Sequence, residues 1–154
     1  MVDVELIPMT PEEFGPYLAQ LVPSYAESHV RTGRWSKEES LEASRKEIDN
    51  ILPKGLETPN EHLFTIHVGR GRPRVGVLWL HAKDGKAFVY ELQVDEPQRR
   101  NGFGRAAMLA AEPIARRLGA KRIALHVFGD NAPARALYRD LGYLETNVQM
   151  AKEL

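Results

Sequence analysis

The chain of 154 residues contains no cysteine. This absence excludes a disulfide framework, a thiolate-ligated metal and a cysteine nucleophile. A chain without disulfides suits a reducing compartment, so we expect a cytoplasmic protein.

An excess of either charge is also missing, because 21 Lys and Arg residues balance 21 Asp and Glu residues. A neutral chain creates no overall field that attracts nucleic acid or a membrane surface. No apolar run approaches the ~18 residues of a membrane span, and the acidic start "MVDVELIPMT" lacks the basic region of an export signal. We expect a soluble protein without a nucleic-acid or membrane partner, folded as a single domain over residues 1–154.

The first third of the chain has the pattern of a short strand followed by two helices. Thr10 and Ser36 each stand three residues before a glutamate, which is the arrangement of a capping box. We expect a strand over 2–8, a helix that starts after Thr10 and is kinked or interrupted at Pro23, and a second helix from Ser36 to Leu52.

The middle of the chain is rich in β-forming residues. Residues 62–68, 74–82 and 86–94 form three such runs, and Asp84-Gly85 between the last two tolerates the positive φ angles of a type I′ hairpin turn. We expect three antiparallel strands here.

After Val94 the apolar period changes to that of a helix. We expect a helix over 103–118, a strand over 122–128, a short helix capped by Asn131 and a last strand over 143–154. The crossover from strand to helix to strand makes one strand pair parallel, so the predicted fold class is α/β with a mixed sheet.

The stretch "PQRRNGFGR" at the start of the long helix is the strongest candidate for a binding site. Free backbone N–H groups at a helix start, together with cationic side chains, can hold an anionic group such as a phosphate. The residues concerned are Arg99, Arg100, Asn101, Gly102, Phe103, Gly104 and Arg105.

A dinucleotide-binding turn is the competing interpretation of these glycines. Gly102, Gly104 and Ala107 satisfy G-x-G-x-x-G/A, and Asp130 ends the next strand where a ribose-binding acid would lie. Against it, "DEPQRR" separates the glycines from their strand, and too little chain follows Asp130 for the remaining strands of such a fold.

Two motifs in register resemble the GNAT superfamily of acyl-CoA-dependent N-acetyltransferases. They are "VDEPQRRNGFG", with R-x-x-G-x-G from Arg99 to Gly104, and "NAPARALYRDLGY" after the next strand. The resemblance implies a mostly antiparallel sheet with a splayed parallel strand pair, flanked by helices. It also implies acetyl-CoA as cosubstrate without a metal, and an amine on a small molecule or a peptide as acceptor. Homodimers are common in such proteins.

The same resemblance implies roles for individual residues. The turn from Arg99 to Arg105 would hold the coenzyme A pyrophosphate, with Asn131 as a helix cap and a further cofactor contact. A bulged strand would expose the backbone of Leu92 and Val94 to the pantetheine arm, with the Val94 N–H aimed at the thioester oxygen.

Two side chains are candidates for catalysis. The resemblance places Tyr138 beside the departing thiolate, although its helical stripe with Leu137 and Leu141 also reads as core. Glu91 lies mid-strand on the face opposite Tyr90, unless a bulge resets the alternation. It is either paired with a cation or positioned to accept a proton from the acceptor ammonium.

The remaining polar residues allow other interpretations. His126 reads as an interior histidine, and no metal-type spacing links the other strand histidines to carboxylates. The acceptor would lie against the N-terminal helices, where the candidates are Tyr25, Glu27, His29 and Trp35.

We predict direct transfer of an acetyl group to a primary amine. The alternatives are a non-catalytic acyl-CoA-binding sensor on the same fold and a dinucleotide-dependent oxidoreductase.

Overall fold

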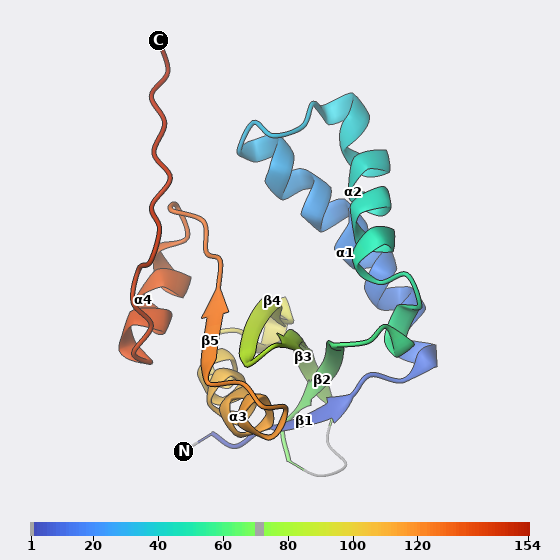
Figure 1. Ribbon diagram of the computed structural model, residues 1–154, viewed down its shortest axis with the longest axis vertical. Helices are drawn as coiled ribbons and strands as arrows, with labels where there is room; N and C mark the ends of the chain where they lie inside the picture. The colour runs from blue at the N-terminus through green and yellow to red at the C-terminus, as the bar shows by residue number, and fades with distance from the viewer. Residues whose placement is uncertain (1, 70–72) are drawn as a thin grey trace.

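The computed structural model describes residues 2–69 and 73–154, with a five-stranded sheet at its centre (Figure 1). The strands lie in the order β1-β2-β3-β4-β5, of which the first four are antiparallel and β5 is parallel to β4. Their bounds are Glu5–Pro8, Glu61–His67, Arg74–Lys83, Lys86–Val94 and Arg122–Leu125. The chain therefore has the expected α/β fold, with a mixed, mostly antiparallel sheet and one parallel pair.

In the described part of the chain, four α-helices flank this sheet. Their bounds are Pro11–Arg31 for α1, Lys37–Ile51 for α2, Phe103–Arg117 for α3 and Ala132–Asp140 for α4. Short 3₁₀ turns, η1 (Gly55–Glu57) and η2 (Glu96–Gln98), precede β2 and α3. Figure 1 shows the pair α1 and α2 on the opposite side of the sheet from α3.

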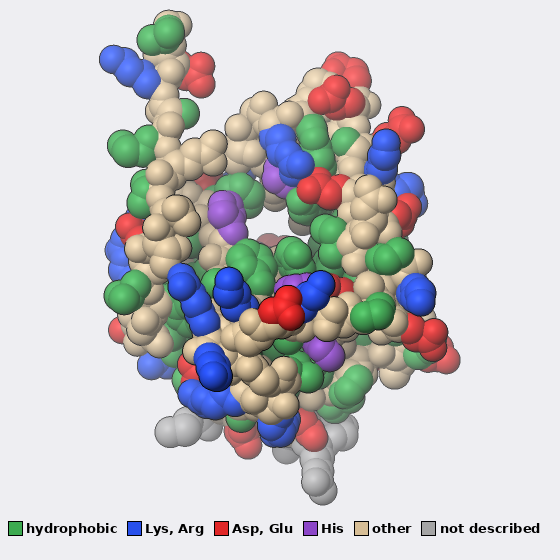
Figure 2. Space-filling model, in the orientation of Figure 1, with side chains coloured by type: hydrophobic (Ala, Val, Ile, Leu, Met, Phe, Trp, Pro, Cys, Tyr) green, Lys and Arg blue, Asp and Glu red, His purple; other side chains and the backbone are tan. Residues whose placement is uncertain are grey.

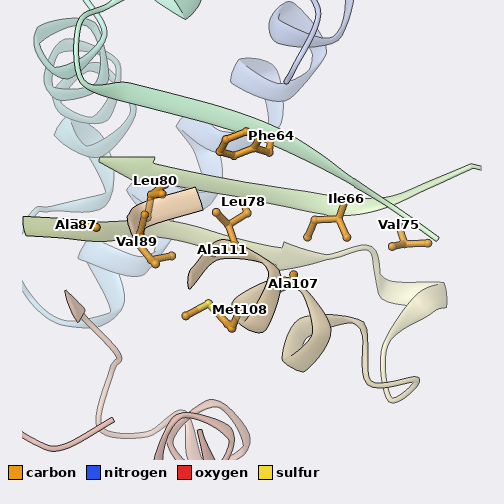
Figure 3. Close-up of a cluster of buried hydrophobic side chains, with 11 residues drawn as sticks. Phe64, Ile66, Val75, Leu78, Leu80, Ala87, Val89, Ala107, Met108 and Ala111 are labelled. Carbon is orange, nitrogen blue, oxygen red and sulfur yellow. The ribbon is translucent and has the colours of Figure 1, made fainter. Parts of the chain in front are cut away.

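Alternate residues of β3 face two separate cores. Val77 and Trp79 pack against the helices α1 and α2. Leu78 and Leu80 point to the other face, where Met108 and its neighbours in α3 complete a cluster shown in Figure 3. The period of two along a strand thus puts one core on each face of the sheet.

The local signals in the sequence are confirmed where they concern caps and turns. Thr10 and Ser36 each form a capping box with the glutamate three residues later. Asp84 and Gly85 both have positive φ, as a type I′ turn requires. Gly119 has a φ of 91° directly after the C-cap of α3, the position where glycine avoids steric strain.

Of the two outcomes expected at Pro23, a kink or an interruption, the interruption does not occur, because α1 continues through Pro23 to Arg31. Leu21 and Val22 beside the proline are buried, and the buried Ser44 hydroxyl of α2 donates to the Val22 carbonyl at 2.7 Å. Packing of Leu21 and Val22 before the proline and of the buried Ala26 after it offsets the one backbone hydrogen bond that it removes.

The expected last strand is wrong, since residues 143–154 have no regular structure. The fifth strand also ends at Leu125 rather than at 128. A strand exists only where a neighbour accepts its backbone hydrogen bonds. No strand in the described part of the chain pairs with residues 143–154.

Gly76 gives a stability prediction because it lies directly against the end of β4. A Cβ atom added there would stand 2.1 Å from the Gln93 carbonyl oxygen. We expect Gly76→Ala to lower the free energy of unfolding by about 2 kcal/mol, and the melting temperature by roughly 4–8 °C.

The matched control is Gly15→Ala in α1, where nothing lies within 4 Å of the added atom. Alanine in a helix interior should raise stability by roughly 0.5–1 kcal/mol. Thermal denaturation of both variants tests the close approach. Equal melting of Gly76→Ala and the parent would contradict it.

Candidate active site

The strand β4 carries a β-bulge at Tyr90. Trp79 of β3 pairs with Glu91, and the next residue, Leu80, pairs with Val89. Tyr90 is therefore the extra residue of the bulge. Such an insertion bends a strand and re-aims the side chains that follow it.

The bulge determines where Glu91 points. Phe88 and Tyr90 share one face, with ring centroids 5.2 Å apart. Strict alternation would send Glu91 to the other face, but the extra residue turns it to the same side, where it meets Tyr17 of α1. Leu92 then returns to the α3 side. Glu91 therefore has the orientation expected if a bulge resets the alternation, on the same face as Tyr90.

Beyond the bulge, β4 and β5 separate. Their pairing extends only as far as Val89 with Leu125. The Asp95 N–H donates to the Val75 carbonyl of β3 at 2.8 Å. Because successive N–H groups of a strand point to opposite sides, those of Leu92 and Val94 point away from β3, toward the gap that β5 leaves.

A cleft of about 170 Å³ occupies this gap and brings four predicted residues together, namely Glu91, Leu92, Asn131 and Tyr138. Figure 2 shows this face of the molecule hollowed at its centre, with hydrophobic and histidine side chains at the rim. The remaining lining residues are Val89, Tyr90, Leu125, His126, Val127, Phe128 and Ala134. Residues of β4, β5 and α4 therefore share one concave site.

Glu91 is a largely buried carboxylate that accepts a hydrogen bond from the Tyr17 hydroxyl. Burial raises the pKa of Glu91, and the Tyr17 hydrogen bond opposes that rise. Burial and the nearby Glu91 charge raise the pKa of Tyr17 well above its usual value, so the phenol stays protonated. The sequence indicated Tyr17 only as part of an apolar helix stripe. No local signal could pair it with a residue 74 positions away.

Tyr138 lines the cleft from α4, with its ring 5.7 Å from that of Tyr143. Burial raises the pKa of Tyr138, so its hydroxyl is protonated at neutral pH and can donate a hydrogen bond. Asn131 caps α4, since its side chain accepts from the Ala134 N–H at 3.3 Å. The structure thus places both residues at the cleft and confirms the cap.

The arginine-rich turn lies outside the lining of this cleft but next to it. Gly104 at the start of α3 is near Leu92, Val94 and Leu137, whose side-chain atoms would be 3.8–3.9 Å from an added Cβ. The Arg99 Nε donates to the Val94 carbonyl at 3.0 Å. The first turn of α3 therefore faces the open end of β4.

The turn itself has a backbone that leaves N–H groups available. Gly102 is the N-cap of α3 with a φ of 80° and no side-chain cap, and Arg100 also has a positive φ of 66°. The N–H groups of Phe103 and Gly104 in the first helical turn have no acceptor within the helix. Arg105 forms an ion pair with Asp140 at 2.8 Å.

The wall opposite the cleft comes from α1 and the loop that follows it. Tyr25, His29 and Trp35 form one aromatic cluster, with ring centroids 4.4–5.9 Å apart. Burial lowers the pKa of His29, and the nearby Arg34 and His126 charges lower it further. Three of the four acceptor candidates are thus gathered here, whereas Glu27 is exposed.

An ion pair and a cation–π contact connect the end of α1 to the segment that follows β5. The Arg31 guanidinium lies 3.1 Å from the Asp130 carboxylate and 5.2 Å from the centre of the Phe128 ring. Arg31 ends α1, whereas both partners follow β5. The C-terminal end of α1 and the segment after β5 are therefore in contact beside the cleft.

The sequence also missed a buried network beneath the bulge. The Glu61 carboxylate accepts from the Trp79 indole at 2.9 Å and lies 2.5 Å from His81 Nδ1. Trp79 and His81 in turn contact the Tyr90 ring. In the residues that the structure describes, no group of three or more His, Cys, Asp or Glu side chains could hold a metal.

A larger hollow of about 350 Å³ lies at the β3–β4 hairpin and contains none of the predicted site residues. Its lining includes His81, Lys83, Lys86, Phe88 and Arg122. The smaller cleft is the better candidate site because it combines a largely buried carboxylate, a partly buried phenol and free backbone.

The chain as a whole is similar to known acetyltransferases. The sequence profile of the Acetyltransferase (GNAT) family matches residues 21–143. YycN of Bacillus subtilis, described as an uncharacterized N-acetyltransferase, is 38% identical over 98% of this chain and 99% of its own. The crystal structure of YycN has a TM-score of 0.91 and covers 98% of both chains. The chain belongs to the GNAT acetyltransferase family.

Two further relatives carry acetyltransferase names. YdgE of Bacillus subtilis, also described as an uncharacterized N-acetyltransferase, is 35% identical over 95% of each chain. A mycothiol acetyltransferase of Saccharomonospora viridis is 44% identical over 66 residues, which are 42% of this chain and 22% of that protein.

Among the described residues, no helix has the length and hydropathy needed to span a membrane.

Proposed function

We propose that this chain, acting as one domain, transfers an acetyl group from acetyl-CoA to a primary amine that attacks the thioester directly. The observation that carries the proposal is the cleft at the fork of β4 and β5, where Glu91 and Tyr138 both lie. Membership of an acetyltransferase family supports the reaction class. A covalent acetyl-cysteine route is excluded because the chain has no cysteine.

The residues present suit a coenzyme A ester. Arg99, Arg100 and the N–H groups of the first turn of α3 can hold its diphosphate, because cations and free amides converge at this helix start. Leu92 and Val94 offer backbone groups on the open side of β4, where an extended amide-containing arm can pair. When bound, the coenzyme supplies an activated acetyl thioester.

In this proposal Glu91 accepts a proton from the acceptor ammonium. The usual pKa values of a glutamate and a lysine-type amine differ by about six units, so direct transfer between unperturbed groups would cost roughly 8 kcal/mol. Burial raises the pKa of Glu91 and narrows this gap, and a water molecule can relay the proton. Tyr17 holds the carboxylate in place.

Tyr138 and Val94 act on the thioester rather than on the acceptor amine. The Val94 N–H polarises the thioester carbonyl as negative charge develops on its oxygen. The Tyr138 hydroxyl donates a hydrogen bond to the departing thiolate. Complete proton transfer from Tyr138 is uphill because burial raises its pKa, so the hydrogen bond itself provides the stabilisation.

The direct test is acetylation of a broad amine panel, read as coenzyme A release with a thiol-reactive dye. The protein contributes no background because it has no cysteine. The panel should include peptide N-termini, lysine peptides, polyamines, aminoglycosides and small-metabolite amines. Tight coenzyme binding without acetylation of any amine would favour the sensor. Thermal protection by NAD but not by coenzyme A would favour the oxidoreductase.

The Arg99→Ala/Arg100→Ala double variant is expected to weaken coenzyme A binding by about 10²-fold, because charge-assisted hydrogen bonds contribute about 1.5–3 kcal/mol each. The matched control is Arg116→Ala/Arg117→Ala, which removes the same two charges at the far end of α3. Calorimetric titration measures both. Equal losses in the two variants would show a general charge effect rather than a binding turn.

The Tyr17→Phe variant should shift the pH profile of kcat/KM rather than abolish activity. The Tyr17 hydrogen bond lowers the pKa of Glu91, so its removal should move the acidic limb of the profile to higher pH. Initial rates across acid to mildly alkaline pH measure the shift. An unchanged profile with an unchanged melting temperature would show that Tyr17 does not position the base.

A further inference from the structure

Three cationic side chains stand side by side across three strands of the sheet. Lys83 of β3 pairs with Lys86 of β4, and Lys86 pairs with Arg122 of β5. Residues directly opposite each other on neighbouring strands point to the same face, so these three charges form what we call the cationic row. All three residues are exposed. Like charges in this arrangement destabilise a sheet unless another group neutralises them.

The described part of the chain does little to neutralise the cationic row. None of its ion pairs includes a member of the row. The hollow of about 350 Å³ that the row lines also contains His81, which is paired with Glu61, and the single carboxylate of Asp84 in the hairpin turn. Figure 2 shows Lys and Arg side chains along the lower edge of the central hollow. This hollow therefore keeps an excess of positive charge.

The cationic row lies on the face of the sheet that carries Glu91. Phe88 follows Lys86 by two residues and so points to the same face. The Phe88 ring is 5.2 Å from the Tyr90 ring, which is 44% exposed and lines the cleft together with Glu91. Two aromatic rings therefore form a continuous floor from the cationic hollow to the candidate base.

The spacing between the row and Glu91 determines which ligands reach both. Glu91 pairs with Trp79 and Lys86 pairs with Lys83, so the two positions are four residues apart along β3. At about 3.4 Å per residue, the separation along the strand is roughly 14 Å. The long side chains of the row shorten the remaining gap to roughly 10 Å, about the reach of three extended residues.

We propose that the cationic row binds an anionic group, a carboxylate or a phosphate, at the end of the acceptor opposite its reacting amine. The amine lies at Glu91, the middle of the acceptor lies over the Phe88 and Tyr90 rings, and the anionic group lies at the row. A hollow lined by one sign of charge also raises the local concentration of such an acceptor. This inference rests on the proposed acetyl transfer and adds to it the class of acceptor.

Two pairs of acceptors that differ only in the anionic group test the proposal. Triglycine is compared with triglycinamide, and 6-aminohexyl phosphate with 6-aminohexanol, by coenzyme A release at low ionic strength. We expect the anionic member of at least one pair to have about 10-fold higher kcat/KM, the scale for a partly exposed charge-assisted contact. Added salt should reduce this preference. The pair that shows it identifies the anionic group as a carboxylate or a phosphate.

The Lys86→Gln/Arg122→Gln variant should lose the preference, so that both members of each pair have similar kcat/KM. Its melting temperature should equal or exceed that of the parent, because the change removes repulsion within the row. The matched control is Arg117→Gln/Lys121→Gln, which removes one Arg and one Lys charge outside the lining of the hollow. The control should keep the preference. Equal loss in both variants would show a general charge effect and overturn the site.

Calorimetric titration of the same four compounds, without acetyl-CoA, separates this proposal from the proposed function. Tighter binding of an anionic member to the parent, but not to Lys86→Gln/Arg122→Gln, supports the anion site even if no amine is acetylated. In that case only the proposed function fails. Where the amines are acetylated, equal kcat/KM for both members of both pairs would overturn the proposal. Equal binding of both members to the parent would overturn it in either case.

Discussion

Replacing Glu91 with glutamine is expected to lower kcat/KM for the amine by about 10²-fold or more, within the range contributed by general acid–base groups. The amide retains the shape of the side chain and can still accept the Tyr17 hydrogen bond, but it takes no proton. Since burial raises the pKa of Glu91, kcat/KM of the parent should increase with pH through that raised value. The Glu91→Gln variant should lack this increase of kcat/KM with pH.

The same substitution should leave the fold intact. The folded-state pKa of Glu91 is raised above its unfolded value, so the free energy of unfolding of the parent falls as pH rises from the unfolded pKa through the folded pKa. Glutamine has no such loss and should be at least as stable as glutamate at neutral pH. Initial rates and thermal denaturation of Glu91→Gln, with Glu91→Asp as a carboxylate-retaining control, separate the two effects. Full activity in Glu91→Gln would falsify the assignment of Glu91 as the base.

Replacing Tyr138 with phenylalanine is expected to reduce kcat by about 10²-fold, the scale for removing one hydrogen-bond donor from a developing charge. Coenzyme A affinity should not change, because the ring and its contact with Tyr143 remain. Single-turnover rates and calorimetric titration measure the two quantities. The result also separates the enzyme from the sensor, since a sensor has no turnover to lose.

Tyr143→Phe is the matched control. In the described part of the chain, the Tyr143 hydroxyl is buried without a hydrogen-bond partner, and burial raises its pKa to about 12. Its removal should preserve kcat and leave stability equal or higher, because an unsatisfied buried hydroxyl costs about 1–3 kcal/mol. Equal loss of kcat in both variants would assign the effect to packing around α4 rather than to a hydrogen bond from Tyr138.

Much of the fold was predictable because its signals are local. A capping box at Thr10, positive-φ tolerance at Asp84-Gly85 and a glycine after the C-cap of α3 each act within a few residues. The expectations that failed concern longer-range effects. Pro23 does not interrupt α1, because packing of Leu21 and Val22 outweighs the proline's local preference.

The candidate site shows the same division. The motif around Gly102 and the cap at Asn131 could be located from the sequence because each depends on neighbouring residues. The partner of Glu91 could not, since Tyr17 lies in another helix and meets it only through the packing of α1 on the sheet. The bulge at Tyr90, which turns Glu91 toward Tyr17, is a property of strand pairing and has no unambiguous sequence pattern.

The sequence by itself determined most of the elements, their order and the residue types that can bind a diphosphate, because caps, turns and apolar periods act over one or two helical turns. The family resemblance implied a splayed strand pair, but only the tertiary structure decided that β4 and β5 separate directly after Val89 and that Glu91 and Tyr138 line one cleft. It also decided that residues 143–154 have no strand partner within the described chain. These outcomes depend on register and on contacts between distant segments, which the local sequence does not encode.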